Sequence, residues 1–208
     1  MNGTLNELTL KKEEAALFLL MIQDVSAKPG GVTKASLLKS SLVVMLYNAI
    51  ESTMTLVFER VHEEIGKIAY PDLSPKIKAI WVDYFFIQNN SKHYQLHLEG
   101  AISKTLKLPD LDVFLNRIKL FSGNLDGRQL DDLMKRYGIG TLKTRNRNLL
   151  LIVKNKRNAI AHGEQSFKEA CREMTVNDIE KLIKATFVAL DDIIQQVNDY
   201  FLQKKYMA

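Results

Sequence analysis

The chain has a single cysteine, Cys171, among its 208 residues. An intramolecular disulfide is therefore excluded, which suits a reducing compartment and leaves packing to hold the fold. The longest apolar runs, such as residues 15–22, are far shorter than the ~18 residues of a membrane-spanning helix. The chain also does not start with a basic and then apolar signal segment. We therefore expect a cytoplasmic protein that does not enter a membrane.

Proline and glycine are also sparse, at 4 and 10 residues, and the apolar fraction of 46% is ordinary for a globular protein. This length is sufficient for a sizeable core without disulfide or metal support. We predict one domain over residues 1–208, in which an N-terminal helix and loop (1–32) precede the core (33–208).

Strand patterns are weak throughout, whereas apolar residues recur at helical spacing in most of the chain. Asp126 and Thr175 each precede such a stretch as an N-cap, and Gly138 is placed to end one. We predict an all-α bundle with a long C-terminal helix and no substantial sheet. The expected helices are 5–25, 33–68, 76–88, 94–98, 127–137, 143–161 and 175–202. Residues 99–125 are expected to form loop or a little extended chain.

Acidic residues are absent from Met134 to Gly163, a segment that contains eight basic residues. These eight exceed the whole net charge of +5, so the basic character of the chain belongs to this segment. A concentrated basic patch favours a polyanion as partner, although a solvated cationic face is the alternative interpretation. The residues are Lys135, Arg136, Lys143, Arg145, Arg147, Lys154, Lys156 and Arg157.

The basic segment ends in Arg157-Asn158, followed after three residues by His162 and Gly163. Gly163 is suited to a left-handed helix end. The helix dipole favours a protonated imidazole in the last turn while nearby cations oppose it, so His162 is expected to titrate near neutrality. Arg157 can hold a phosphate through its planar fork of donors. These groups are the parts of a metal-free phosphodiester-cleaving site.

The motif resembles the signature of the HEPN superfamily, an arginine, usually a polar residue, and a histidine after four to six intervening residues. Four residues separate Arg157 from His162 here. Other segments resemble one bacterial branch of that superfamily, so that the resemblance spans about residues 36–205. They are Leu46-Tyr47-Asn48-Ala49-Ile50-Glu51, Ser122-Gly123-Asn124-Leu125-Asp126, Tyr137-Gly138-Ile139, Ser166-Phe167 and Thr175.

The resemblance implies a helical fold and a dimeric ribonuclease that acts as a toxin or phage-defence effector. In this interpretation His162 is the general acid or base, Arg157 stabilises phosphoryl charge, and Asn158 orients His162 or the phosphate by hydrogen bonds. RNA backbone contacts are expected from Arg145, Arg147, Lys154 and Lys156. No cofactor or metal is implied. The alternative is a non-catalytic HEPN module that binds RNA or a protein partner, such as an antitoxin or a defence-complex subunit.

The geometry of an ideal helix predicts a dimer independently. At about 100° per residue, one face collects Leu149, Ile152, Val153 and Ile160, which we expect to point into the bundle. The nearly opposite face collects Leu151, Asn155, Asn158 and His162. Arg157 lies about 140° from His162, so that one protomer does not bring both groups to one phosphate. A second copy packed through this helix would form a composite cleft.

Several signals have simpler interpretations. His162 can cap its own helix while Arg157 pairs with Glu164. Glu51 either pairs with a basic motif residue or, as we expect, is an ordinary exposed glutamate. His93 and His97 have the i, i+4 spacing of metal ligands, but no third ligand is evident nearby. Ser122 lacks an adjacent base and acid, so a serine nucleophile is not expected.

Overall fold

The structure is a computed structural model that describes residues 2–87, 93–120 and 124–208. Ser122 and Gly123, which belong to one of the family-like segments, and Gln88, the expected end of a helix, lie outside the described residues. The described part contains eight α-helices and no β-strand, apart from an isolated bridge between Leu73 and Met207. The predicted all-α fold is confirmed.

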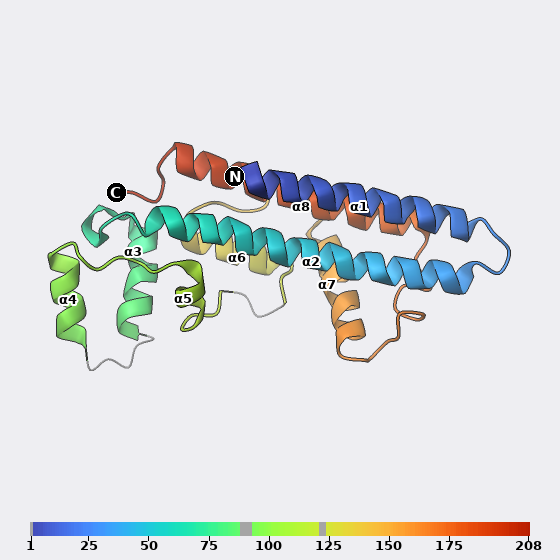
Figure 1. The fold of residues 1–208 in the computed structure, drawn as a ribbon, viewed down its shortest axis with the longest axis horizontal. Helices are drawn as coiled ribbons and strands as arrows, with labels where there is room; N and C mark the ends of the chain where they lie inside the picture. The colour runs from blue at the N-terminus through green and yellow to red at the C-terminus, as the bar shows by residue number, and fades with distance from the viewer. Residues whose placement is uncertain (1, 88–92, 121–123) are drawn as a thin grey trace.

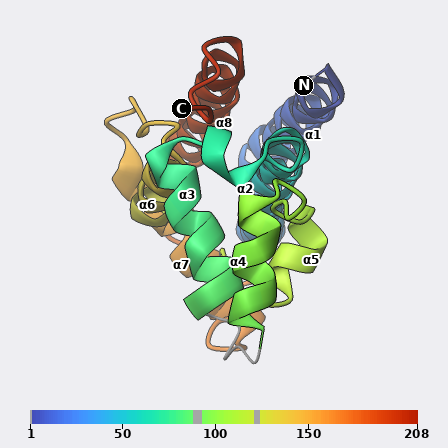
Figure 2. The ribbon, with the colours of Figure 1, turned by 90° about the vertical axis from the view of Figure 1, so that its left-hand side faces the viewer.

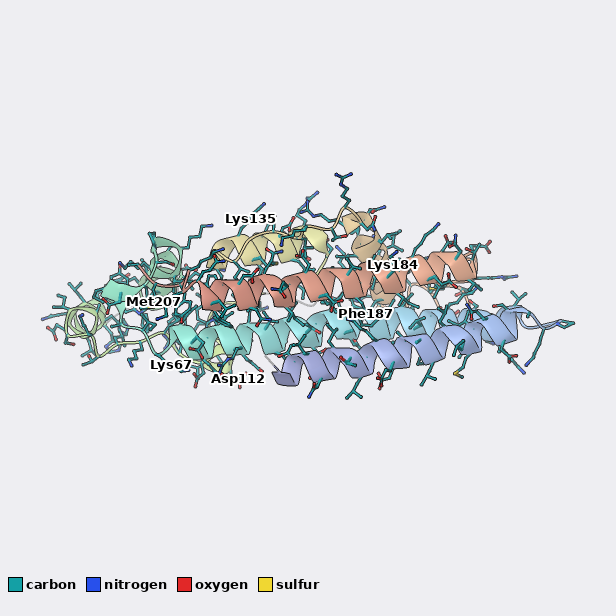
Figure 3. The ribbon with its side chains drawn as sticks, turned by 90° about the horizontal axis from the view of Figure 1, so that it is seen from above. Lys67, Asp112, Lys135, Lys184, Phe187 and Met207 are labelled. Atoms are coloured by element: carbon teal, nitrogen blue, oxygen red, sulfur yellow. The ribbon has the colours of Figure 1, made fainter. Side chains whose placement is uncertain are left out.

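Three long helices form the body of the molecule: α1 (Asn2–Ser26), α2 (Val32–Ile65) and α8 (Val176–Leu202). They run side by side along the long axis (Figure 1), and each contacts the other two. Figure 3 shows Phe187 on the side of α8 that faces α1 and α2. Phe187 is 6% exposed, consistent with the amphipathic pattern that predicted this helix.

The central helix α2 supplies much of the core, including Leu42, Leu46, Val57 and Phe58, which are fully buried. By length and composition alone α2 could cross a membrane, but 56% of its most apolar segment is buried inside the protein. It also contacts α1, α5, α7 and α8. Other helices of the protein therefore cover much of α2.

Shorter helices lie across one end of the long ones, where α3 (Pro75–Val82) and α4 (Tyr94–Ile102) stand side by side (Figure 2). A 3₁₀ turn (Tyr70–Asp72) precedes α3 and a π-helical turn (Asp83–Ile87) follows it. The prediction for residues 99–125 was wrong in part: α4 continues to Ile102, and Leu111–Leu115 forms α5 rather than extended chain. Leu111 and Phe114 are both buried there, and their spacing of three requires a helical turn to point both inward.

The remaining helices are α6 (Gly127–Tyr137) and α7 (Arg147–Ala161). The predicted caps are confirmed, because Asp126 and Thr175 both complete capping boxes and Gly138 ends α6 with φ +80°. However, α7 starts four residues later than predicted. The backbone N–H groups of Leu142 and Lys143 donate to the carboxylates of Asp131 and Asp192, both at 2.7 Å, which ties this segment to α6 and α8.

The side chain of His62 is completely buried between α2, α5 and α6. Its Nδ1 lies 3.0 Å from the carbonyl oxygen of Pro109 and its Nε2 lies 2.8 Å from the hydroxyl of Tyr137. A carbonyl can only accept, so Nδ1 carries the proton and Nε2 accepts from Tyr137. Burial is the main cause that lowers the pKa of His62, so the imidazole is neutral in the folded protein.

We predict that this histidine makes folding sensitive to mild acid. The unfolded chain takes up a proton near pH 6.5, whereas the folded pKa is lower. The contribution to stability is therefore complete above about pH 6.5 and decreases as the pH falls below it. Urea unfolding between pH 7.5 and 5.5 should show a falling free energy of unfolding. His62→Gln should flatten this dependence, and an equally steep dependence in that variant would contradict the assignment.

Candidate functional site

The motif helix α7 stands across α2 and α8 and projects away from the long helices (Figure 1). Its buried residues are Leu150 and Val153, with Leu149 and Ile160 partly buried against the core. The prediction that Ile152 points inward was wrong, since its side chain is 37% exposed. Because α7 crosses its neighbours instead of lying along them, they cover only a narrow stripe of its surface. Ile152 lies about 100° around the helix axis from the buried Val153, outside that stripe.

The opposite face of α7 is accessible, as expected. Leu151 is 41% exposed, and Asn155 and His162 are also exposed. His162 caps the helix with its backbone N–H on the carbonyl of Asn158 at 2.9 Å, and Gly163 follows with φ +73°. The His162 imidazole forms no hydrogen bond with any side chain or backbone group of the described residues. It is therefore presented to the surface at the projecting end of α7.

Arg157, in contrast, is held against α2. Its guanidinium lies 4.4 Å from the centroid of the Tyr47 ring, a cation–π distance. It also donates to the Oδ1 of Asn158 at 3.0 Å and pairs with the Glu51 carboxylate at 3.5 Å. The interpretation of Glu51 as an ordinary exposed glutamate was wrong, because its side chain is only 27% exposed and pairs with a basic motif residue, which was the alternative interpretation. The acidic partner of Arg157 shown here is Glu51 rather than Glu164.

Tyr47 connects this contact to the segment before α6. Its hydroxyl accepts a hydrogen bond from the backbone N–H of Leu125 at 3.0 Å. Burial, partly offset by this hydrogen bond and reinforced by the negative charge of Glu51, raises the pKa of Tyr47 to about 12. Tyr47 is therefore a neutral phenol that offers Arg157 an intact aromatic face.

Three consecutive residues before α6 each form a hydrogen bond with the motif helix α7 or with Tyr47 on α2. Asn124 accepts from the Nδ2 of Asn158 at 2.6 Å. Leu125 donates to Tyr47 as described, and Asp126 accepts from the Nζ of Lys154 at 2.8 Å. The segments around residues 47–51, 124–126 and 154–158, widely separated in sequence, thus meet at one place.

Asp126 serves two helices at once. One carboxylate oxygen caps α6 by accepting from the N–H groups of Arg128 and Gln129, and the other binds Lys154. Burial raises the pKa of Asp126, but the hydrogen bond from Lys154 and those from the backbone outweigh it and leave the pKa lowered. Asp126 is therefore ionised at neutral pH. It forms a largely buried ion pair with Lys154, in which the side chains of Lys154 and Asp126 are 16% and 15% exposed.

The four predicted RNA-binding cations divide into two kinds. Lys154 pairs with Asp126, and Arg147 pairs with Asp131 at 3.0 Å while donating to the carbonyl of Leu142 at 2.6 Å. Arg145 is exposed and Lys156 is partly exposed, and neither forms an ion pair with a described residue. The first two cations bind acidic partners, although the Arg147 side chain is itself 46% exposed, whereas the second two have no acidic partner among the described residues.

The chain that follows His162 is anchored to α2. The hydroxyl of Ser36 donates to the carbonyl of Lys168 at 2.7 Å, and the buried Nζ of Lys39 donates to the carbonyl of Met174 at 2.6 Å. Cys171 is buried in this segment, and burial raises the pKa of its thiol, so it is a poor nucleophile. The motif end of α7 is therefore held by the segment before α6 and by the anchored chain that follows His162.

The two histidines with metal-ligand spacing, His93 and His97, have ring centroids 6.4 Å apart. Among the residues that the structure describes, no group of three or more His, Cys, Asp or Glu side chains is close enough to hold a metal ion. His97 instead packs beside Phe85 and Phe86.

A sequence model of the MAE_28990-like HEPN family matches residues 5–206. The chain belongs to the HEPN superfamily. The match includes every residue of the contacts described above, from Tyr47 and Glu51 to His162. Neither the curated proteins nor the solved structures include a match to this chain. Arg157 and His162, whose spacing resembles the HEPN signature, lie just before the last turn and at the C-cap of α7.

We predict that the Tyr47 hydroxyl stabilises this HEPN site. Tyr47→Phe keeps the ring beneath Arg157 but leaves the buried N–H of Leu125 without its acceptor, which costs about 1–3 kcal/mol. Urea denaturation measures the loss. Tyr94→Phe is the matched control. The Tyr94 side chain is exposed, so removal of its hydroxyl should change the free energy of unfolding by less than about 0.5 kcal/mol. Equal effects of the two substitutions would contradict the prediction.

Proposed function

We propose that this HEPN protein is a metal-independent endoribonuclease in which His162 and Arg157 act on the scissile phosphate. The observation that supports this proposal is that one of the two side chains is held by its neighbours and the other is exposed. The Arg157 guanidinium is oriented by Tyr47, Glu51 and Asn158, whereas the His162 imidazole is exposed at the end of α7. A preorganised cation and an accessible acid–base group are what phosphodiester cleavage requires.

In the proposed reaction the ribose 2′-oxygen attacks the adjacent phosphorus and the bond from phosphorus to the 5′-oxygen breaks. His162 takes the proton of the 2′-hydroxyl or, in the protonated form, gives a proton to the departing 5′-oxygen. Arg157 stabilises the charge that develops on the phosphoryl oxygens, and Asn158 holds Arg157 in orientation. The products are a 2′,3′-cyclic phosphate and a 5′-hydroxyl, and DNA resists because it lacks the nucleophile.

The site is proposed to be completed by a second copy of the chain. Arg157 lies about 140° around α7 from His162, so that one helix does not direct both groups at one phosphate. The exposed apolar side chain of Ile152 supports a contact between two copies through α7. A two-fold axis near the end of α7 would place the Arg157 of one protomer opposite the His162 of its partner.

RNA binding is proposed to use Arg145 and Lys156 for direct phosphate contacts, because these cations are exposed or partly exposed. Lys154 and Arg147 contribute mainly to the local field, since Asp126 and Asp131 already engage them. The proposed cellular role is that of a cytoplasmic toxin or phage-defence effector, with an antitoxin or a defence-complex subunit as a possible regulator. This role rests on the bacterial HEPN resemblance.

The test is cleavage of an end-labelled, mixed-sequence RNA by the pure protein in EDTA. We expect the wild type to cleave RNA but not the matching DNA, and to leave cyclic phosphate ends. Arg157→Ala and His162→Ala should each reduce the rate at least about 100-fold, the order of one general acid–base contribution. Circular dichroism checks their folding. Equal cleavage by all three proteins, or none by the wild type, would refute catalysis; binding without cleavage would support the non-catalytic module instead.

A mixing experiment tests the composite site. Co-expressed Arg157→Ala and His162→Ala chains with different tags would form heterodimers that retain one intact pair, Arg157 of one protomer and His162 of the other. We expect the doubly tagged dimer to recover cleavage that each homodimer lacks. A doubly tagged dimer that stays inactive would place both groups of each site in one protomer, and a monomer in light scattering would remove the dimer proposal.

A further inference from the structure

A cleft of about 610 Å³ lies where the starts of α6 and α7 meet, at the end of α7 opposite the motif. Its size is within the range of ligand-binding sites. The close approach of the two helices here requires a glycine at 127, because a Cβ at that position would lie 2.9 Å from the Cβ of Arg147. The lining residues are Asp126, Gly127, Arg128, Gln129, Asp131, Arg147, Asn148 and Leu151.

The charges in the cleft leave one cation without an acidic partner. The two lining carboxylates are both paired, Asp126 with Lys154 and Asp131 with Arg147. Arg128 is exposed and forms no ion pair with any residue that the structure describes. The cleft with its ion-paired partners therefore carries a net positive charge, which favours an anionic ligand.

The other available groups suit a nucleotide. Asn148 is exposed and its side chain makes no hydrogen bond within the described part of the chain. Gln129 accepts the N–H of Asp126 with its Oε1, so its amide N–H groups remain free to donate. Amide side chains read base edges, and the 41% exposed Leu151 gives an apolar wall.

A single stripe on α7 joins this cleft to the motif. At about 100° per residue, positions 148, 151, 155, 158 and 162 fall within roughly 80° of one another. The distance from Leu151 to His162 along the helix is about 16 Å. A strand bound along this stripe would therefore reach the cleft with one end and His162 with the other, and a two-fold contact at the motif end leaves the cleft open.

We infer that the cleft is a subsite for one nucleotide of single-stranded RNA, a few positions from the phosphodiester presented to His162. Arg128 binds a phosphate of that strand, and Asn148 and Gln129 bond to the edge of the base beside Leu151. The inference rests on the proposed RNA-cleaving function and adds to it a determinant of affinity and base preference.

The test measures binding of a fluorescein-labelled, mixed-sequence 20-nucleotide RNA by anisotropy, in a His162→Ala background that prevents cleavage. Arg128→Gln should weaken binding about tenfold, the effect of one charge-assisted hydrogen bond. It should also reduce the slope of log affinity against log salt by about 0.7. Asn148→Ala should weaken binding without changing that slope. Lys107→Gln is the matched control, since it removes one exposed cation in the segment between α4 and α5, far along the molecule from α7 (Figure 1).

The outcomes separate the subsite from the function on which it rests. If both cleft variants bind RNA as the Lys107→Gln control does, while the wild type still cleaves RNA, the subsite is refuted and the ribonuclease stands. If the cleft variants lose affinity as expected but the wild type does not cleave, the subsite stands and catalysis is refuted. If no variant binds RNA, both proposals are refuted.

Discussion

The organisation of the site depends on one contact, the Arg157 guanidinium on the face of Tyr47 with Glu51 beside it. A partly buried guanidinium is costly unless a carboxylate and hydrogen-bond acceptors surround it. Here α2 supplies the carboxylate and the ring, and the hydroxyl of Tyr47 then fixes Leu125. Because Asn124 and Asp126 flank Leu125 and bind α7, the same contact also sets the position of the motif helix.

In the proposed function, the two halves of the motif meet opposite physical demands. A group that stabilises developing charge works best when its orientation is fixed beforehand, and Arg157 is fixed by three neighbours. A group that exchanges protons has to be reached by substrate and has to keep both ring nitrogens available. His162 satisfies this requirement because it follows the last residue of α7 and its side chain is exposed.

Local signals were sufficient to predict most of the helices and the caps of α6 and α8, but not α5. Asp126 and Thr175 were identified as N-caps because a capping box involves only residues within four consecutive positions of the sequence. The site contacts were not predictable in this way, since Glu51 and Arg157 are 106 residues apart and nothing local marks them as partners. Ile152 was placed wrongly for a related reason. Periodicity gives the direction of a side chain, but only the crossing of α7 over its neighbours determines how wide its covered stripe is.

The basic segment shows how far a charge count in sequence can differ from a charge distribution in space. Its freedom from acidic residues suggested a continuous cationic surface, yet other segments supply Asp83, Asp126, Asp131 and Glu51 to its members. The long-range field is therefore weaker than eight like charges would give, and few cations remain to release counterions from a bound polyanion. In the proposed function, recognition of RNA by such a surface has to rely on the placement of individual groups along α7, so that geometry rather than net charge would determine binding.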